Sequence, residues 1–285
     1  ETEGVIAVHA EDEERLVQRF ETHKHRTDMA AHAEWRDSET ALLATQRAVR
    51  LAKIYGRKLH VLHLTSGLEA NWLFGKTNLV QETVDGGRVS TEVLPQHLTF
   101  DQHDVEKEGT RLKMNPPIRY SEDKEILWKR LIDGTIQCIA TDHAPHLLSA
   151  KAAGWPKAPS GMPGVETSLA VMLTHAKNGR CTIEDVVRWM STNPAAIYGM
   201  KGKGKIEIGQ DADFALVDMN SSMKVDDSRS WSKVGWNPFH GRELVGWTVA
   251  TFVGGIQVFE RDFNEKRKGN IIIPAGQTGK PLEMA

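Results

Sequence analysis

Short apolar runs alternate with amphipathic stretches through the first half of the chain. Apolar runs ended abruptly by polar residues are typical of buried strands in a parallel sheet, and we expect them at residues 5–8, 59–64, 89–94 and 136–140. Helical periodicity predicts the intervening helices at residues 13–20, 38–55, 67–74 and 122–132. Asp37 or Ser38 is expected to cap the second of these helices, and Ser121 the fourth. This alternation predicts an α/β fold with a parallel sheet, most simply part of a barrel.

The pattern changes towards the C-terminus. Residues 146–163 contain several Gly and Pro residues and are expected to form a mobile loop. Helices are then expected at residues 165–177, 182–190 and 193–198. Short strands are expected at residues 205–208, 213–217, 245–253 and 257–259. We therefore expect two domains, residues 1–200 with the parallel sheet and residues 201–285 with a small β-rich domain and a polar tail.

Composition excludes several classes of function. The 36 Lys and Arg residues nearly balance the 38 Asp and Glu residues, so no basic field favours nucleic acid. No polybasic or amphipathic stretch indicates a membrane surface. Cys138 and Cys181 lack metal-binding spacing, which favours reduced thiols and a cytoplasmic protein. The chain begins without Met or a signal peptide and enters a strand almost at once, so we expect that it starts within a domain.

Side chains that bind metals follow three of the expected strands. His9, His63 and Asp142 each come directly after an apolar run. Because parallel strands deliver their carboxyl ends to one face, these three side chains are expected to lie together. Imidazole and carboxylate groups suit zinc in an open catalytic site. A single strand-end histidine is more often structural, and Asp142 alone could equally cap a helix, but three such positions favour a metal site.

Five segments carry a resemblance to a known family, and they are residues 8–12, 60–66, 113–119, 140–146 and 160–166. With these segments the chain resembles the C-terminal portion of a dihydroorotase, in the metal-dependent amidohydrolase superfamily. The Asn-Pro-Pro-Ile-Arg run at 115–119 and the Thr-Asp-His-Ala-Pro-His run at 141–146 separate dihydroorotases from hydantoinases. The resemblance implies a (β/α)8 TIM barrel, with only its second half (strands 5–8) in residues 1–200, and a small C-terminal β-sandwich domain in residues 201–285.

The resemblance also implies roles for individual residues. His9 and His63 would be ligands of one zinc ion, and Asp142 would bind a second zinc ion and act as general base and acid. Substrate contacts are assigned to Asn115, His146, Pro163 and Gly164. The implied reaction is the reversible, zinc-dependent cyclisation of N-carbamoyl-L-aspartate to L-dihydroorotate in pyrimidine biosynthesis. The resemblance leaves room for a homodimer and for association with aspartate transcarbamoylase.

Two family elements do not lie within this sequence: the His-x-His-x-Arg run of the first strand, and the bridging aspartate or carbamylated lysine. The run at 23–26 looks superficially similar but is not expected to bind metal. We therefore expect that residues 1–285 alone neither fold stably nor turn over dihydroorotate. His97 and His143 are expected to have structural roles. Two alternatives stay open, another cyclic amidohydrolase of the hydantoinase or allantoinase type, and a non-catalytic scaffold partner of aspartate transcarbamoylase.

Overall fold

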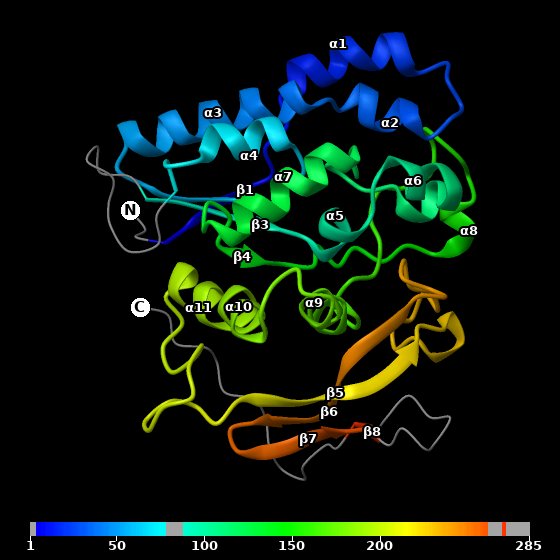
Figure 1. Ribbon diagram of the computed structural model, residues 1–285. Helices are drawn as coiled ribbons and strands as arrows, with labels where there is room; N and C mark the ends of the chain where they lie inside the picture. Colours follow the sequence, from blue (N-terminus) through cyan, green and yellow to red (C-terminus); the bar gives the residue numbers. More distant parts are fainter. Residues whose placement is uncertain (1–3, 78–87, 262–269, 272–285) are drawn as a thin grey trace. The chain divides into compact units, whose positions relative to one another are not determined.

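The computed structural model describes residues 4–77, 88–261 and 270–271. The chain forms two compact units, residues 1–164 and residues 165–285. Each unit contains one four-stranded sheet (Figure 1). The helices at residues 168–198 belong to the second unit, and the predicted domain boundary between residues 200 and 201 stays a prediction.

The sheet of the first unit is parallel and follows chain order. It contains β1 (Ile6–Val8), β2 (Lys58–Val61), β3 (Arg88–Val93) and β4 (Cys138–Ile139), paired in the order β1-β2-β3-β4. Val61 and Val89 are fully buried, whereas Ile6 on the edge strand β1 is 45% exposed. Parallel neighbours need crossover connections, and each crossover contains helices. The predicted α/β fold with a parallel sheet is confirmed.

Four of the eight helices in the described part of the first unit begin at a residue whose side chain caps them. The helices are α1 (Glu13–His23), α2 (Ala30–Trp35), α3 (Ser38–Ile54), α4 (Gly67–Leu73), α5 (Pro95–Thr99), α6 (Gln102–Glu108), α7 (Ser121–Ile132) and α8 (Leu148–Lys151), with a 3-10 turn η1 (Gly109–Leu112). The four capped helices are α1, α3, α4 and α6. Asp37 caps α3, since its side chain accepts a hydrogen bond from the Thr40 amide. The predicted cap of α7 was wrong: Ser121 is already helical, and Tyr120 at the capping position makes no side-chain bond.

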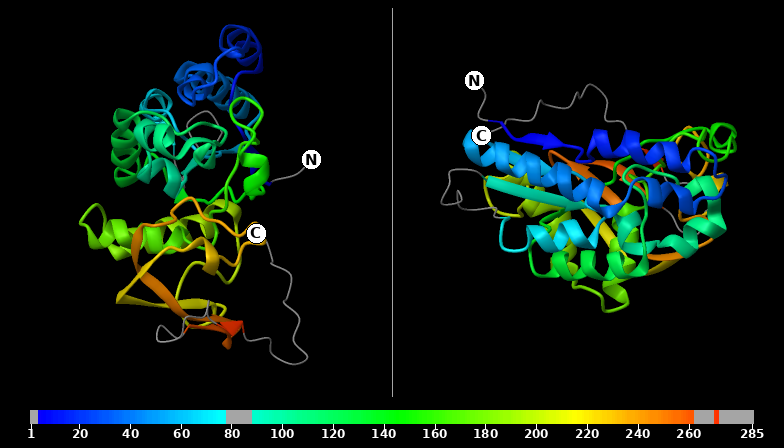
Figure 2. Two further views of the ribbon diagram at one scale, coloured as in Figure 1. Left: turned by 90° about the vertical axis from the view of Figure 1, so that its right-hand side faces the viewer. Right: turned by 90° about the horizontal axis from the view of Figure 1, so that it is seen from above.

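These helices pack in succession along the sheet. In Figure 1, α3, α4 and α7 lie next to one another, and α4 contacts both of the others. The helices α1 and α2 pack against each other, as the two further views in Figure 2 show. The predicted loop at residues 146–163 contains the short helix α8, which the sequence pattern missed. The helices α3, α4 and α7 therefore form one packed layer of the first unit.

The second unit combines helices with an antiparallel sheet. Its elements are α9 (Ser168–Lys177), α10 (Ile183–Val187), a π-helical turn η2 (Arg188–Thr192), α11 (Asn193–Tyr198), β5 (Phe214–Lys224), a 3-10 turn η3 (Asp227–Arg229), β6 (Glu243–Val253), β7 (Ile256–Glu260) and β8 (Asn270–Ile271). The strands β5 and β6 run side by side (Figures 1 and 2). Gly254 and Gly255 join β6 to β7 with φ values of 59° and 80°, a conformation that two-residue hairpin turns require.

One predicted strand of this unit was wrong. Residues 205–208 form no regular secondary structure, and Ile206 and Ile208 are 90% and 107% exposed. Their alternating pattern is strand-like, but no strand of the described residues pairs with them. Among the described residues, no helix combines the length and the hydropathy needed to cross a membrane.

Candidate active site

His9 and His63 lie side by side at the carboxyl ends of β1 and β2. His9 Nδ1 is 3.1 Å from His63 Nε2, and the ring planes make an angle of 73°. The strands end level with each other because Val8 lies opposite Val61 in the parallel register. The His9 side chain is 42% exposed, whereas His63 is buried. The pair therefore faces solvent on one side and the unit's interior on the other.

Two of the predicted metal ligands have unusual backbone conformations. His63 has a φ of 35° and Asp142 a φ of 44°, and among the described residues these are the only non-glycine residues with positive φ. Side chains disfavour this region, and such strained residues concentrate at functional sites. Glu92 on β3 helps to hold His63, because its Oε1 accepts a hydrogen bond from the His63 amide at 3.3 Å. The strain thus marks the ends of β2 and β4 as candidate functional positions.

A buried ion pair orients His9. Glu11 Oε2 lies 2.8 Å from His9 Nε2, and Arg36 donates to the same carboxylate at 2.7 Å. Burial acts to raise the pKa of Glu11, but hydrogen bonds from His9 and Arg36 outweigh it and lower the pKa to about 2. The ionised carboxylate favours a proton on His9 Nε2, which leaves the Nδ1 lone pair facing His63.

The two histidines fit a bound metal ion. Two nitrogens on one tetrahedral zinc, each bonded at 2.0–2.1 Å, lie about 3.3 Å apart, close to the 3.1 Å seen between His9 and His63. Burial lowers the pKa of His63, and the neighbouring His9 lowers it further. Its imidazole is therefore neutral at pH 7, which is the form that binds metal.

Asp142 lies close enough to affect His63 without contacting it. Its negative charge acts to raise the pKa of His63, and its own side chain is exposed. The three predicted ligands do not form a group whose ligand atoms all lie within 4.8 Å of one another. The structure therefore brings His9 and His63 into direct contact and leaves Asp142 beside them.

Within the described residues, His60, Glu92 and Cys138 are the only group that meets that distance criterion. Both imidazole nitrogens of His60 are engaged, at 2.8 Å from Ser90 Oγ and 3.0 Å from Glu92 Oε2. Burial raises the pKa of the Cys138 thiol well above its usual value, and Glu92 adds to this effect. The Cys138 thiol is thus protonated, and both nitrogens of His60 already have partners. We therefore interpret the group as a buried hydrogen-bond network that positions Glu92, which in turn bonds the His63 amide.

The predicted substrate residues lie on three separate segments, at residues 115, 146 and 163–164. Asn115 Oδ1 is buried and has no hydrogen-bond partner among the described residues. His146 Nε2 lies 3.1 Å from the Ser160 carbonyl. Pro163 and Gly164 are buried, and a Cβ at Gly164 would lie 2.8 Å from the Thr141 carbonyl. The Pro163-Gly164 turn therefore packs directly against the residue that precedes Asp142.

Two further histidines support these segments. His143 Nδ1 accepts a hydrogen bond from the Gly164 amide at 3.1 Å. His97 Nε2 lies 3.4 Å from the Pro116 carbonyl, next to Asn115. Burial lowers the pKa of His97 to about 3, and the nearby His63 contributes to this lowering. Both histidines therefore contact backbone groups next to the candidate site, the Gly164 amide and the Pro116 carbonyl.

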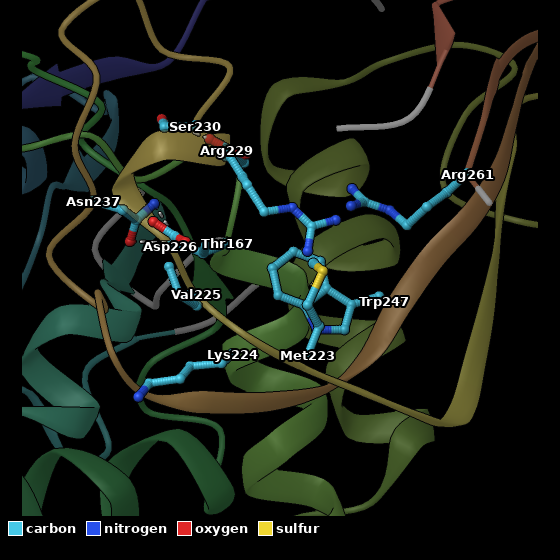
Figure 3. A pocket seen from close by; sticks show the side chains of 11 residues that line it. Thr167, Met223, Lys224, Val225, Asp226, Arg229, Ser230, Asn237, Trp247 and Arg261 are labelled. Carbon is cyan, nitrogen blue, oxygen red and sulfur yellow. Dashed lines mark hydrogen bonds between the residues drawn. The ribbon is translucent and has the colours of Figure 1, made fainter. Parts of the chain in front are cut away.

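A separate pocket lies in the second unit. Figure 3 shows Arg229 and Arg261 pointing toward each other above Trp247. Glu166 also lines this pocket and accepts hydrogen bonds from Ser230 Oγ and the Trp231 amide, each at 3.0 Å. None of the predicted metal or substrate residues lines this pocket, so it is not the candidate active site.

Sequence reasoning missed Glu11, Arg36 and Glu92. Glu11 stands two residues after His9, and this spacing was the only available signal for it. Arg36 and Glu92 reach the site from α2's end and from β3, and only the folded chain brings them there.

Comparison with curated proteins shows which sequences this chain is similar to. The dihydroorotase of Halobacterium salinarum is 36% identical over 261 residues, covering 90% of this chain and 58% of that protein. The dihydroorotase of Bacillus caldolyticus is 38% identical over 217 residues, covering 75% of this chain and 49% of that protein. The chain thus spans about half the length of the curated relatives it matches.

Solved structures agree on the fold. The L-hydantoinase from Arthrobacter aurescens matches with a TM-score of 0.85 and 33% identity, covering 94% of this chain and 58% of that chain. The dihydropyrimidinase from Brevibacillus agri matches with a TM-score of 0.81 and 26% identity, covering 89% of this chain and 56% of that chain. A model of the amidohydrolase family matches residues 4–258. The predicted resemblance is therefore confirmed, and the chain belongs to the amidohydrolase family.

Proposed function

We propose that the protein is a dihydroorotase, which catalyses the reversible, zinc-dependent cyclisation of N-carbamoyl-L-aspartate to L-dihydroorotate in pyrimidine biosynthesis. The observation that carries this proposal is the 3.1 Å approach of His9 Nδ1 to His63 Nε2 at the ends of two parallel strands. The strained backbone of His63 and Asp142 supports it. The dihydroorotases among the curated relatives agree with it.

In this proposal His9, His63 and Asp142 are metal ligands, and Glu11 orients His9 through its hydrogen bond. Two bound zinc ions would polarise the ring amide carbonyl and make water more acidic. Asp142 would accept the proton of the attacking water and deliver it to the amide nitrogen as the C–N bond breaks. In the direction of cyclisation the same carboxylate would remove that proton from the nitrogen.

Asn115, His146 and the Pro163-Gly164 turn are proposed to bind the substrate. The buried Oδ1 atom of Asn115 is an acceptor without a partner in the described chain, and the ring N–H groups of dihydroorotate are donors that could satisfy it. Leaving a buried acceptor unpaired costs about 1–3 kcal/mol. Binding of such a ring would therefore remove a cost that the ligand-free site carries.

We also infer that the parallel sheet belongs to a (β/α)8 barrel and the antiparallel sheet to a β-sandwich. The chain-order pairing of four parallel strands and the fit to 58% of the L-hydantoinase chain support this. A domain boundary at residues 200/201, a cytoplasmic location, a homodimer and association with aspartate transcarbamoylase belong to the same proposal.

The second candidate is a hydantoinase, favoured by the match to the L-hydantoinase structure. Turnover of L-dihydroorotate, hydantoin and allantoin by the intact, zinc-loaded protein distinguishes the candidates. A site that hydrogen-bonds its substrate discriminates strongly, so we expect dihydroorotate to be preferred by at least about tenfold in kcat/KM. Preference for hydantoin would contradict the proposal, and no turnover of any substrate at full zinc loading would favour a non-catalytic scaffold.

A further inference from the structure

Two lysines of the first unit are buried without a carboxylate partner among the described residues. Lys113 is 5% exposed and Lys151 is 1% exposed. Burial lowers the pKa of Lys113 to about 8, and Arg36 contributes to this lowering. Burial lowers the pKa of Lys151 to about 7, and Lys113 contributes. Burying a cation costs free energy unless hydrogen bonds compensate for the lost water, so both ammonium groups need hydrogen-bond partners inside the protein.

The ammonium group of Lys151 is bonded entirely to backbone. It donates to the carbonyls of Lys113 at 2.8 Å, Pro159 at 3.0 Å and Gly161 at 2.8 Å. These three bonds use all the donors that an ammonium group has. The Gly161 amide also donates to the Lys113 carbonyl at 2.9 Å. Lys151 therefore joins two segments that are far apart in the sequence.

Lys113 donates hydrogen bonds to the same loop. Its ammonium group donates to the carbonyls of Pro156, at 2.8 Å, and Ala158. Backbone carbonyls of a buried loop need partners, because water cannot reach them. The two lysines supply these partners for the loop that leads to Pro163.

The residues that Lys151 holds are the neighbours of the proposed substrate contacts. Lys113 lies two positions before Asn115. Pro159 and Gly161 flank Ser160, whose carbonyl lies 3.1 Å from His146 Nε2. A single ammonium group thus fixes the backbone beside both Asn115 and His146.

We propose that Lys151 is a positioning residue for the substrate: its ammonium group locks the segment carrying Asn115 to the loop that contacts His146 and ends in the Pro163-Gly164 turn. It thereby sets the affinity for a cyclic amide. This inference rests on the proposed dihydroorotase function. Lys151 itself is not proposed to touch the reacting atoms.

The test compares Lys151→Met with Lys124→Met in the intact protein. Lys124 is a suitable control because it also lies in the first unit, where its ammonium group pairs with Asp101 at 2.7 Å. The rate of hydrogen exchange at the Gly161 and Gly164 amides measures how readily the loop that leads to Pro163 opens. We expect exchange at least about tenfold faster in Lys151→Met, because local opening exposes these amides, and no change at these amides in Lys124→Met.

Kinetics supply the second readout. Lys151→Met should raise KM for dihydroorotate by at least about tenfold and change kcat by less than about threefold, since binding rather than chemistry is affected. Zinc content should equal that of the wild type. Lys124→Met should leave KM unchanged.

Unchanged loop exchange in a folded Lys151→Met variant, or faster exchange with an unchanged KM, would overturn the proposal. If the wild-type protein does not hydrolyse dihydroorotate, the proposed function fails, whereas the exchange data still decide whether Lys151 holds the loop. If Lys151→Met does not fold, Lys151→Gln, which keeps two donors, replaces it. Wild-type exchange and KM in that variant would equally contradict the inference.

Discussion

His9 Nδ1 lies 3.1 Å from His63 Nε2 although 54 positions separate the two residues in the chain. The parallel pairing of β1 with β2 explains this approach, because both strands end at the same edge of the sheet. The Glu11 carboxylate is hydrogen-bonded to the His9 imidazole, and the Glu92 carboxylate accepts a hydrogen bond from the backbone amide of His63. The pair is therefore built by the fold rather than by a local motif.

Glu11→Gln should weaken zinc binding. Residues that orient metal-binding histidines typically contribute about 10–100-fold to metal affinity, and the amide would lose both the charge and one acceptor shared by His9 and Arg36. Competition with a chromogenic chelator measures the affinity. Glu14→Gln, on the exposed face of α1, is the matched control. Equal zinc affinities in the two variants would show that Glu11 does not support the metal.

Asn115→Ala should weaken dihydroorotate binding while leaving bound zinc unchanged. The variant removes a buried acceptor that the substrate is proposed to pair with, and one hydrogen bond of about 1.4 kcal/mol corresponds to about tenfold in Kd. Calorimetry with dihydroorotate and metal analysis measure the two quantities. Asn178→Ala, at the exposed end of α9, should change neither. Loss of zinc with unaltered dihydroorotate binding would contradict the assignment.

Gly161→Ala should impair substrate binding, whereas Gly154→Ala should not. Both glycines have positive φ, 128° and 72°, so an alanine is strained at either position. Only at Gly161 would the new Cβ lie 2.7 Å from the Ala144 carbonyl and 3.2 Å from the His146 ring. We expect KM to rise at least about tenfold in Gly161→Ala alone. Similar KM values in both variants would separate this glycine from substrate binding.

Glu69 should make the protein less stable as pH rises through the weakly acidic range. Burial raises the pKa of this carboxyl from 4.5 to about 7, although the hydroxyl of Thr45 donates to it. Between pH 4.5 and 7 the folded state holds a proton that the unfolded state releases, so the free energy of unfolding falls with pH, by at most about 3 kcal/mol.

Glu69→Gln should flatten this dependence, because the amide stays neutral and keeps an acceptor for Thr45. Urea unfolding of both proteins at pH 5 and pH 8 measures the difference. The variant should be more stable than the wild type at pH 8 and similar to it at pH 5. A parallel pH dependence in the two proteins would assign the effect to other groups.

Much of the fold could be predicted from the sequence because local patterns and the tertiary structure agree. The apolar run of β2 is buried, and Asp37 caps α3 as its position before the periodic segment suggests. The pattern at residues 205–208 misled because alternation alone cannot reveal whether a partner strand exists. Ser121 misled because a residue that can cap a helix is also tolerated within its first turn.

The site was predicted only in part. Strand-end residues such as His9 and His63 can be read from the sequence, because the polar residue that ends an apolar run lies at a known edge of a parallel sheet. Arg36, Glu92 and Lys151 could not, since their roles depend on contacts with distant parts of the chain. A lysine in a predicted loop is ordinarily expected to be solvent-exposed, and nothing in the sequence around Lys151 shows its burial.

The most direct test is an anomalous difference map from crystals of the zinc-loaded protein, recorded at the zinc absorption edge. We predict one peak within about 2.0–2.1 Å of a ring nitrogen of both His9 and His63, and a second peak beside a carboxylate oxygen of Asp142. A centre without His9 and His63, or zinc bound instead among His60, Glu92 and Cys138, would contradict the account.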